Sequence, residues 1–109
     1  MGAGRQISGL LDEAVSRLVQ QLHPERVYLF GSQARGDAGP DSDYDLMVIV
    51  PQSDRPRYAR AWLAYEALYG IGVPIEVLVL TREEFDRDLP VATSLPATVN
   101  REGQLLYAA

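Results

Sequence analysis

The sequence predicts a small mixed α/β (α+β) domain, in which helices pack on a mixed β-sheet, and three observations predict this class. Apolar residues recur at helical spacing in some segments and form short continuous runs in others. A strand–helix–strand order spans residues 43–80, which favours a parallel pair of strands. The chain has 109 residues, the usual length of one domain, so we expect a single domain over residues 1–109.

The chain is predicted to begin with a helix followed by a buried strand. Apolar residues at helical spacing predict an amphipathic helix from Ser8 to Leu22, which Pro24 ends. The apolar run 27–30 is closed by Gly31 and predicts the first strand.

The middle of the chain is predicted to form a second strand, a second helix and a third strand. Residues 36–42 are rich in turn formers and predict a loop. Residues 43–50 begin polar and become apolar, which predicts a second buried strand. A helix is expected over 55–69, a break over 70–74 and a third strand over 75–80. Because only a short loop joins the first strand to the second, we expect that pair to be antiparallel.

The last segment is predicted less fully. Thr81 and Glu84 have the spacing of a capping box, which opens a short helix. Beyond Pro96 we expect a helical turn that ends near Gly103, and we assign no strand to Leu105–Tyr107.

The residue inventory excludes several classes of function. Fifteen acidic and ten basic residues give a net charge of −5, which argues against general nucleic-acid binding. All ten basic residues are Arg, so a P-loop lysine and a Schiff base are excluded. Without cysteine and with one histidine, His23, structural zinc sites, thiol nucleophiles and disulfides are excluded. No apolar run is long enough to span a bilayer and no signal segment is evident, so we expect a cytoplasmic protein without membrane contact.

Three carboxylates are predicted to meet at one edge of the sheet. Asp43 and Asp45 are two residues apart at the start of the second strand, so their side chains point to one face. Glu76 begins the third strand and lies beside Asp45 if the two strands are parallel. Hard divalent cations offset the repulsion among such groups. Two Mg²⁺ ions about 3.5–4 Å apart can clamp the oxygens of a phosphoryl transfer.

A Gly-Ser turn is predicted at the same edge and supplies contacts for phosphate. Gly31 lets the backbone approach a phosphate closely, and Ser32 adds a hydroxyl and an amide donor. Ser32 can also serve as the N-cap of a short helical turn. Arg35 can add a positive charge, and a surface ion pair with Asp37 or Asp41 is an equal alternative.

These residues match a known signature. Gly31-Ser32, ten further residues and then Asp43-x-Asp45 form the motif of the DNA polymerase β-like nucleotidyltransferase superfamily. The segment GSQARGDAGPDSDYDL resembles most closely the motif of the minimal nucleotidyltransferases. The resemblance covers residues 27–80 and implies a polymerase β-like nucleotidyltransferase fold.

The resemblance also implies roles for single residues. Gly31 and Ser32 would hold the nucleotide triphosphate, and Asp43 and Asp45 would be catalytic metal ligands. Glu76 stands where the family usually has Asp, and it would ligate metal or activate the acceptor hydroxyl. Many members have Arg where this chain has Gln33, which leaves Arg35 as the nearest cation for the nucleotide.

The implied function is that of a Mg²⁺-dependent enzyme that moves AMP from ATP to a hydroxyl acceptor. Many minimal nucleotidyltransferases are antitoxins that AMPylate a tyrosine of a helical HEPN ribonuclease toxin, so the resemblance implies such a toxin as the partner. One alternative is a non-catalytic antitoxin or binding module that covers its partner. The other is a small-molecule, aminoglycoside-type nucleotidyltransferase with a separate helical subunit, because 109 residues leave no room for a second domain.

An aromatic stripe on the predicted 55–69 helix leaves two interpretations open. Its members recur at helical spacing: Tyr58, Trp62, Tyr65 and Tyr69. Such a stripe usually belongs to the core. Ala59, Leu63 and Ala67 mark a second apolar side of the helix, so a partner surface is the other interpretation. For the cluster Arg55, Arg57 and Arg60, a solvated helix start is favoured over contacts with the triphosphate.

Overall fold

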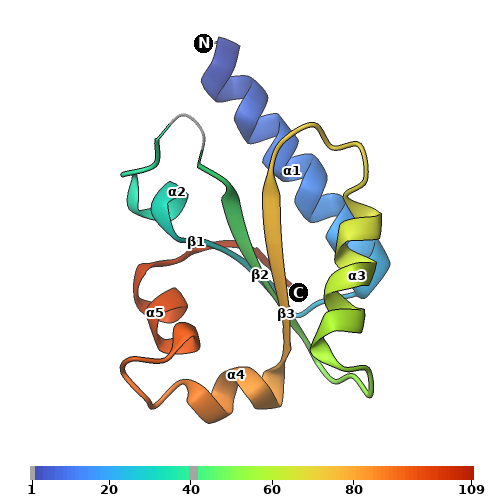
Figure 1. Ribbon diagram of the computed structural model, residues 1–109, viewed down its shortest axis with the longest axis vertical. Helices are drawn as coiled ribbons and strands as arrows, with labels where there is room; N and C mark the ends of the chain where they lie inside the picture. Colours follow the sequence, from blue (N-terminus) through green and yellow to red (C-terminus); the bar gives the residue numbers. More distant parts are fainter. Residues whose placement is uncertain (1, 40–41) are drawn as a thin grey trace.

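The computed structural model describes residues 2–39 and 42–109, and residues 2–8 as backbone alone. It contains every helix and strand that the sequence predicts, and α1 begins six residues earlier than expected (Figure 1). In chain order the elements are α1 (Gly2–Leu22), β1 (Arg26–Phe30), α2 (Ser32–Arg35), β2 (Tyr44–Val50), α3 (Arg57–Ala67), β3 (Ile75–Thr81), α4 (Arg82–Asp88), α5 (Leu95–Glu102) and β4 (Gln104–Ala108).

The four strands form one mixed sheet in the order β3-β2-β1-β4. β1 is antiparallel to β2, and β2 is parallel to β3, as expected. α3 makes the crossover between the two parallel strands, and α2 is a single helical turn between β1 and β2. The order places the end of β1 and the beginnings of β2 and β3 at the same edge of the sheet.

Helices cover both faces of the sheet (Figure 1). α1 and α3 lie on one face and share a core with alternate strand residues: Ala14, Leu18, Val27, Leu29, Leu46, Val48, Val50, Ala64, Leu68, Val77 and Val79. α4 and α5 lie on the other face over a smaller core: Tyr28, Met47, Ile49, Leu80, Phe85 and Val99. Within the described residues, no helix is both long and apolar enough to cross a membrane.

The strand β4 is the element that sequence analysis missed. It pairs antiparallel with β1, with an irregular register between Val27 and Tyr28. Its sequence, QLLYA, contains an apolar run as long as the one that predicts β1. A short apolar run does not by itself separate a strand from a helical end, and this run follows α5 directly. Gly103 makes the connection possible, because a Cβ there would collide with the carbonyl oxygen of Val99 and lie tightly against that of Leu29.

The core interpretation of the aromatic stripe is wrong. Tyr58, Trp62, Tyr65 and Tyr69 are 79%, 61%, 45% and 88% exposed. The buried side of the helical segment carries Arg60, Ala64 and Leu68 instead. Because Arg60 interrupts the apolar spacing of the buried side, the aromatic side shows the clearer helical periodicity in the sequence.

Arg60 is buried, so the prediction that it belongs to a solvated helix start is also wrong. Its Nη1 lies 2.7 Å from Glu84 Oε1 and donates to the Val79 carbonyl at 3.0 Å. Glu84 in turn completes the predicted capping box with Thr81. The hydrogen bond from Arg60 lowers the pKa of Glu84 to about 2. The pair therefore joins α3, β3 and α4.

Candidate active site

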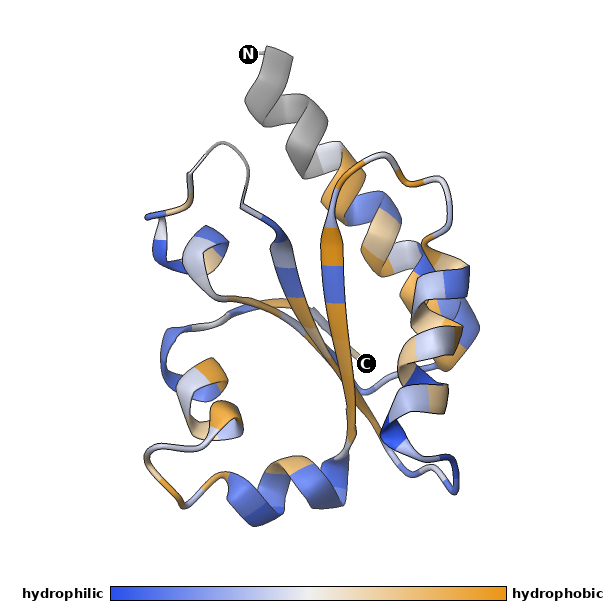
Figure 2. Ribbon diagram, in the orientation of Figure 1, coloured by the Kyte–Doolittle hydropathy of each residue, from blue (hydrophilic) through white to orange (hydrophobic). Residues whose placement is uncertain are grey.

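The strand register places three side chains in a row across the sheet. Phe30 is the partner of Asp45 in the antiparallel pair, and Asp45 is the partner of Glu76 in the parallel pair. Neighbouring strands lie about 4.8 Å apart, so the two carboxylates are adjacent. Alternation puts them on the same face of the sheet as α4 and α5. Figure 2 shows a hydrophilic band across the beginnings of β2 and β3, which are otherwise apolar.

The three predicted carboxylates repel one another. Asp43 is exposed and directly precedes β2. Burial raises the pKa of Asp45, and the negative charges of Glu76 and Asp43 raise it further, as does a hydrogen bond to Glu76. The structure thus brings Asp45 and Glu76 side by side and keeps Asp43 within electrostatic range. Repulsion of this kind is what a bound cation relieves.

Gly31 is required by its conformation and by its neighbour. Its φ of +74° lies in the left-handed region, and a Cβ would collide with the carboxylate of Asp45. Gly31 is the N-cap residue of α2, and Ser32 is the first helical residue. The N-cap interpretation of Ser32 is therefore wrong. The turn lies directly beside the row of carboxylates, as predicted.

Two polar side chains of α2 have identified partners. Arg35 Nε lies 3.2 Å from Asp37 Oδ2, and both side chains are exposed. The predicted surface pairing with Asp37 is confirmed, whereas Asp41 lies outside the described residues. Gln33 donates from Nε2 to the carbonyl of Ser42 at 3.2 Å. This bond ties α2 to the segment that carries Asp43 into β2, a role that sequence analysis missed.

A pocket of about 410 Å³ adjoins the carboxylates and is lined by Phe30, Asp45, Tyr65, Glu76, Val77 and Leu78. Tyr65 comes from α3, and its hydroxyl accepts a 3.0 Å hydrogen bond from the backbone N–H of Val77. That bond holds the outer edge of β3 directly after Glu76. Sequence analysis missed Tyr65 as a site residue, because its position depends on how α3 crosses beside β3.

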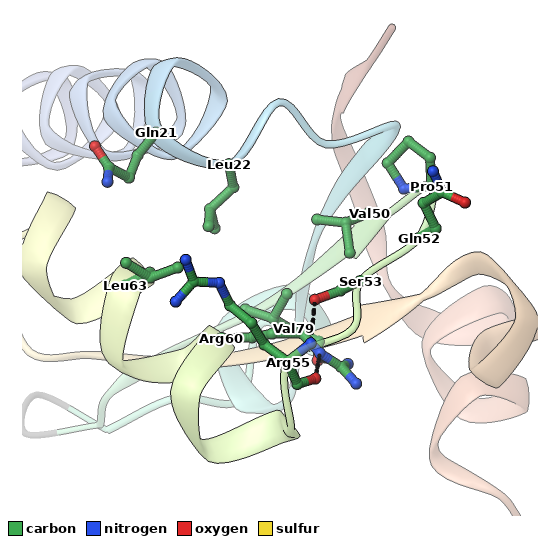
Figure 3. Close-up of a pocket in the computed structure, with 10 residues that line it drawn as sticks. All are labelled: Gln21, Leu22, Val50, Pro51, Gln52, Ser53, Arg55, Arg60, Leu63 and Val79. Carbon is green, nitrogen blue, oxygen red and sulfur yellow. Dashed lines mark hydrogen bonds between the residues drawn. The ribbon is translucent and has the colours of Figure 1, made fainter.

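A second pocket, of about 270 Å³, lies at the opposite ends of β2 and β3 (Figure 3). Its polar groups already bind one another. Ser53 Oγ accepts from the Arg55 backbone N–H at 3.1 Å, and Arg60 Nε donates to the Arg55 carbonyl at 2.9 Å. Its lining contains no carboxylate. We therefore place the candidate active site at the Asp45 end of the strands.

The donor set fits a hard divalent cation that a nucleotide helps to hold. Within the described residues, no group of three or more His, Cys, Asp or Glu side chains forms a ready-made metal cage. Mg²⁺ is usually held by one or two carboxylates together with substrate phosphates rather than by such a cage. Asp43, Asp45 and Glu76 offer only oxygen donors. Burial, followed by the charges of Glu76 and Asp43, raises the pKa of Asp45, and the positive charge of Arg35 offsets part of that rise.

Comparisons with known proteins identify the domain family and the fold. A family model described as "Nucleotidyltransferase domain" matches residues 11–104. No curated protein is significantly similar to the chain in sequence.

Three solved structures share the fold. One, from Sulfolobus solfataricus and assigned as a nucleotidyltransferase, is 24% identical with a TM-score of 0.68, over 94% of this chain and 83% of that chain. A chain of a toxin–antitoxin structure with AMP-PNP is 20% identical with a TM-score of 0.64, over 90% and 73%. A mutant form of the toxin–antitoxin MntA–HpeT is 16% identical with a TM-score of 0.62, over 90% and 73%. At these identities the likeness shows the fold alone.

Proposed function

The chain belongs to the nucleotidyltransferase domain family, and we propose that it transfers AMP from ATP to a hydroxyl group of a partner protein. One observation carries the proposal. Asp45 and Glu76 lie side by side across β2 and β3, next to the Gly31 turn. Carboxylates beside a glycine turn are what metal-assisted transfer from a nucleotide requires.

In this proposal each residue of the site has one role. Gly31 and Ser32 hold the β- and γ-phosphates, and Asp43 and Asp45 hold Mg²⁺. When bound, Mg²⁺ would neutralise the charge that develops on the phosphate oxygens. The acceptor oxygen forms a bond to the α-phosphorus while the bond from that phosphorus to the bridging oxygen breaks. Pyrophosphate leaves, and the proton of the acceptor hydroxyl moves to Glu76.

The ligand preference rests on two observations. The oxygen-only donor set suits Mg²⁺, and the adjoining pocket of about 410 Å³ lies in the size range of small-molecule sites. A toxin–antitoxin structure of the same fold contains AMP-PNP, an ATP analogue. We propose ATP as the substrate and one or two Mg²⁺ ions as the cofactor. Arg35 is a weaker candidate for nucleotide binding, because it pairs with Asp37.

We propose an antitoxin role, with a tyrosine of a HEPN-type ribonuclease toxin as the acceptor. Two toxin–antitoxin structures share the fold, and the sequence resembles the minimal nucleotidyltransferases. Two other functions compete with this one. In a steric antitoxin the carboxylates would be dispensable, and in a small-molecule nucleotidyltransferase the label would pass to a compound of low mass.

The test follows label from α-labelled ATP in the presence of Mg²⁺ and a lysate of the source organism. The wild type is compared with Asp43→Asn/Asp45→Asn. We expect a small labelled protein that appears with the wild type only. Label in a small hydroxylated compound would instead support the small-molecule enzyme. No transfer by either form, together with toxin neutralisation by both, would support the steric antitoxin and contradict the proposal.

A further inference from the structure

The exposed aromatic side of α3 remains unexplained by the fold. Tyr58, Trp62, Tyr65 and Tyr69, which we call the aromatic face, follow one stripe along the helical segment 57–69 and are 45–88% exposed. An aromatic side chain presents about 150–250 Å². Four of them together reach the ~300–600 Å² of the largest apolar patch on a typical monomer, which is often functional. This area also supplies most of the ~800 Å² that each partner buries in a standard interface.

The aromatic face is continuous with the candidate active site. Tyr65 belongs to the stripe and also lines the pocket of Asp45 and Glu76. Its hydroxyl holds the N–H of Val77, so its ring is fixed at the rim of that pocket. A molecule that lies along the aromatic face therefore passes beside the pocket of the carboxylates at Tyr65. We propose that the aromatic face is the docking surface for the protein that carries the acceptor hydroxyl, an inference that rests on the proposed function.

The charges around the face select the kind of partner. Glu66 is exposed on α3 beside the stripe, and Asp43 and Glu76 are exposed at the active-site end. Two arginines lie near the ends of the stripe: Arg57 is half exposed beside Tyr58, and Arg17 donates to the Tyr69 carbonyl at 3.0 Å. Single-stranded nucleic acid also stacks on aromatic side chains, but it needs a basic groove, and these carboxylates repel phosphates. A second copy of the chain also carries a net charge of −5, so the two copies would repel each other. A protein with an apolar surface, and with cations on the side that meets Asp43 and Glu76, is complementary to the face.

The test separates docking from chemistry. The protein labelled by the wild type is identified by mass spectrometry and purified, and it is then used as the acceptor. Trp62→Ser/Tyr69→Ser removes two of the four aromatic residues of the face and leaves Tyr65 in the pocket. Leu105→Ser is the matched control, because Leu105 is a 51% exposed apolar residue on β4. We expect the double variant to raise KM for the protein acceptor at least tenfold and to leave kcat at saturation unchanged. Its affinity for AMP-PNP with Mg²⁺ should also be unchanged, and the control should behave as wild type.

Each other outcome overturns the proposal in a recognisable way. If the wild type labels a protein and the double variant keeps its KM within twofold, the proposed function stands and the docking surface is wrong. If the wild type sediments alone as a dimer that the double variant converts to monomer, a second copy covers the face. If the label passes to RNA, the partner class is wrong. If the wild type labels no macromolecule, the proposed function fails first and this inference fails with it.

Discussion

The carboxylates at the two ends of the parallel strands β2 and β3 have opposite surroundings: those at one end are paired with arginine, and those at the other lie beside further carboxylates. At the carboxyl ends Arg60 binds Glu84, and the pKa of that carboxyl falls to about 2. At the amino ends Asp45 lies beside Glu76 and near Asp43, and burial and their charges raise its pKa. A carboxylate that is paired with an arginine stabilises the fold, whereas carboxylates gathered beside one another are a candidate place for a ligand that supplies positive charge.

The largest effect on the rate of AMP transfer is expected from removing the carboxylate charges at the amino ends of β2 and β3. Asp43→Asn/Asp45→Asn should lower the rate of AMP transfer by about 10³-fold or more, because both proposed metal ligands are lost. Label transfer from α-labelled ATP measures this loss. Asp54→Asn/Asp86→Asn is the matched control, since it removes two exposed carboxylates elsewhere. Equal activity of the two double variants would show that the amino end is not the reacting site.

Substitution of Arg60 at the carboxyl ends of β2 and β3 should lower the stability of the fold rather than the rate of AMP transfer. Arg60→Met leaves the half-buried Glu84 without its main partner and should cost about 3 kcal/mol of unfolding free energy. Thermal unfolding should then shift down by on the order of 10–20 °C. Arg57→Met is the control, because Arg57 is half exposed and lies 3.7 Å from Glu84. Its cost should stay below about 1 kcal/mol. A similar loss in both variants would contradict the structural role of Arg60.

Gly31 tests how closely the turn and the carboxylates are coupled. Gly31→Ala should lower AMP transfer by roughly 10²-fold, because the new Cβ strains φ and displaces the Asp45 carboxylate. Gly36→Ala has the same positive φ but open space around its Cβ, so it isolates the strain. Activity assays of both variants, normalised to folded protein, separate the two causes. If both lose the same activity, the collision with Asp45 has no catalytic consequence.

Lowering the pH should reduce the free energy of unfolding, because it protonates Glu84 at the carboxyl ends of β2 and β3. Because its folded-state pKa is lowered from 4.5 to about 2, its contribution is complete above pH 4.5 and is lost as the pH falls toward 2. We expect the wild type to lose on the order of 2 kcal/mol over this range through this group. Unfolding midpoints of the wild type and of Glu84→Gln should therefore converge as the pH falls. A constant gap between them would contradict the pKa.

The smallest effect is expected at the amino ends of β2 and β3, where the ionised Asp45 lowers the free energy of unfolding, whereas the ionised Glu84 raises it. Asp45 has a raised folded-state pKa, so its ionised form weakens the fold at neutral pH, and the penalty disappears as the pH falls below that pKa. Asp45→Asn should stabilise the metal-free protein by less than about 1 kcal/mol. Mg²⁺ with AMP-PNP should raise the unfolding midpoint of the wild type only. A loss of stability in Asp45→Asn would show that the carboxylate supports the fold.

Much of the fold followed from local patterns. Apolar runs located β1, β2 and β3, and the Thr81 capping box located the start of α4. β4 was missed because its short apolar run follows α5 directly, where the run alone does not separate a strand from a helical end. The buried side of α3 was missed because an arginine lies in it, and the pairing of Arg60 with Glu84 depends on residues 24 positions apart.

The candidate site was predictable where it lies on strand ends. The spacing of Gly31, Asp45 and Glu76 fixed their positions once the strand directions were known. Tyr65 and Gln33 were not predictable, because each depends on a contact between separate elements: α3 with β3, and α2 with the loop before β2.

The most direct test of the contrast between the two strand ends is calorimetric binding of AMP-PNP in the presence and absence of Mg²⁺. The wild type should bind with Mg²⁺ and lose most of its affinity without it. Asp45→Asn should lose at least about tenfold with Mg²⁺ present, whereas the exposed-carboxylate control Asp86→Asn should match the wild type. Equal, Mg²⁺-independent binding by all three proteins would contradict the assignment of the amino end as the metal and nucleotide site.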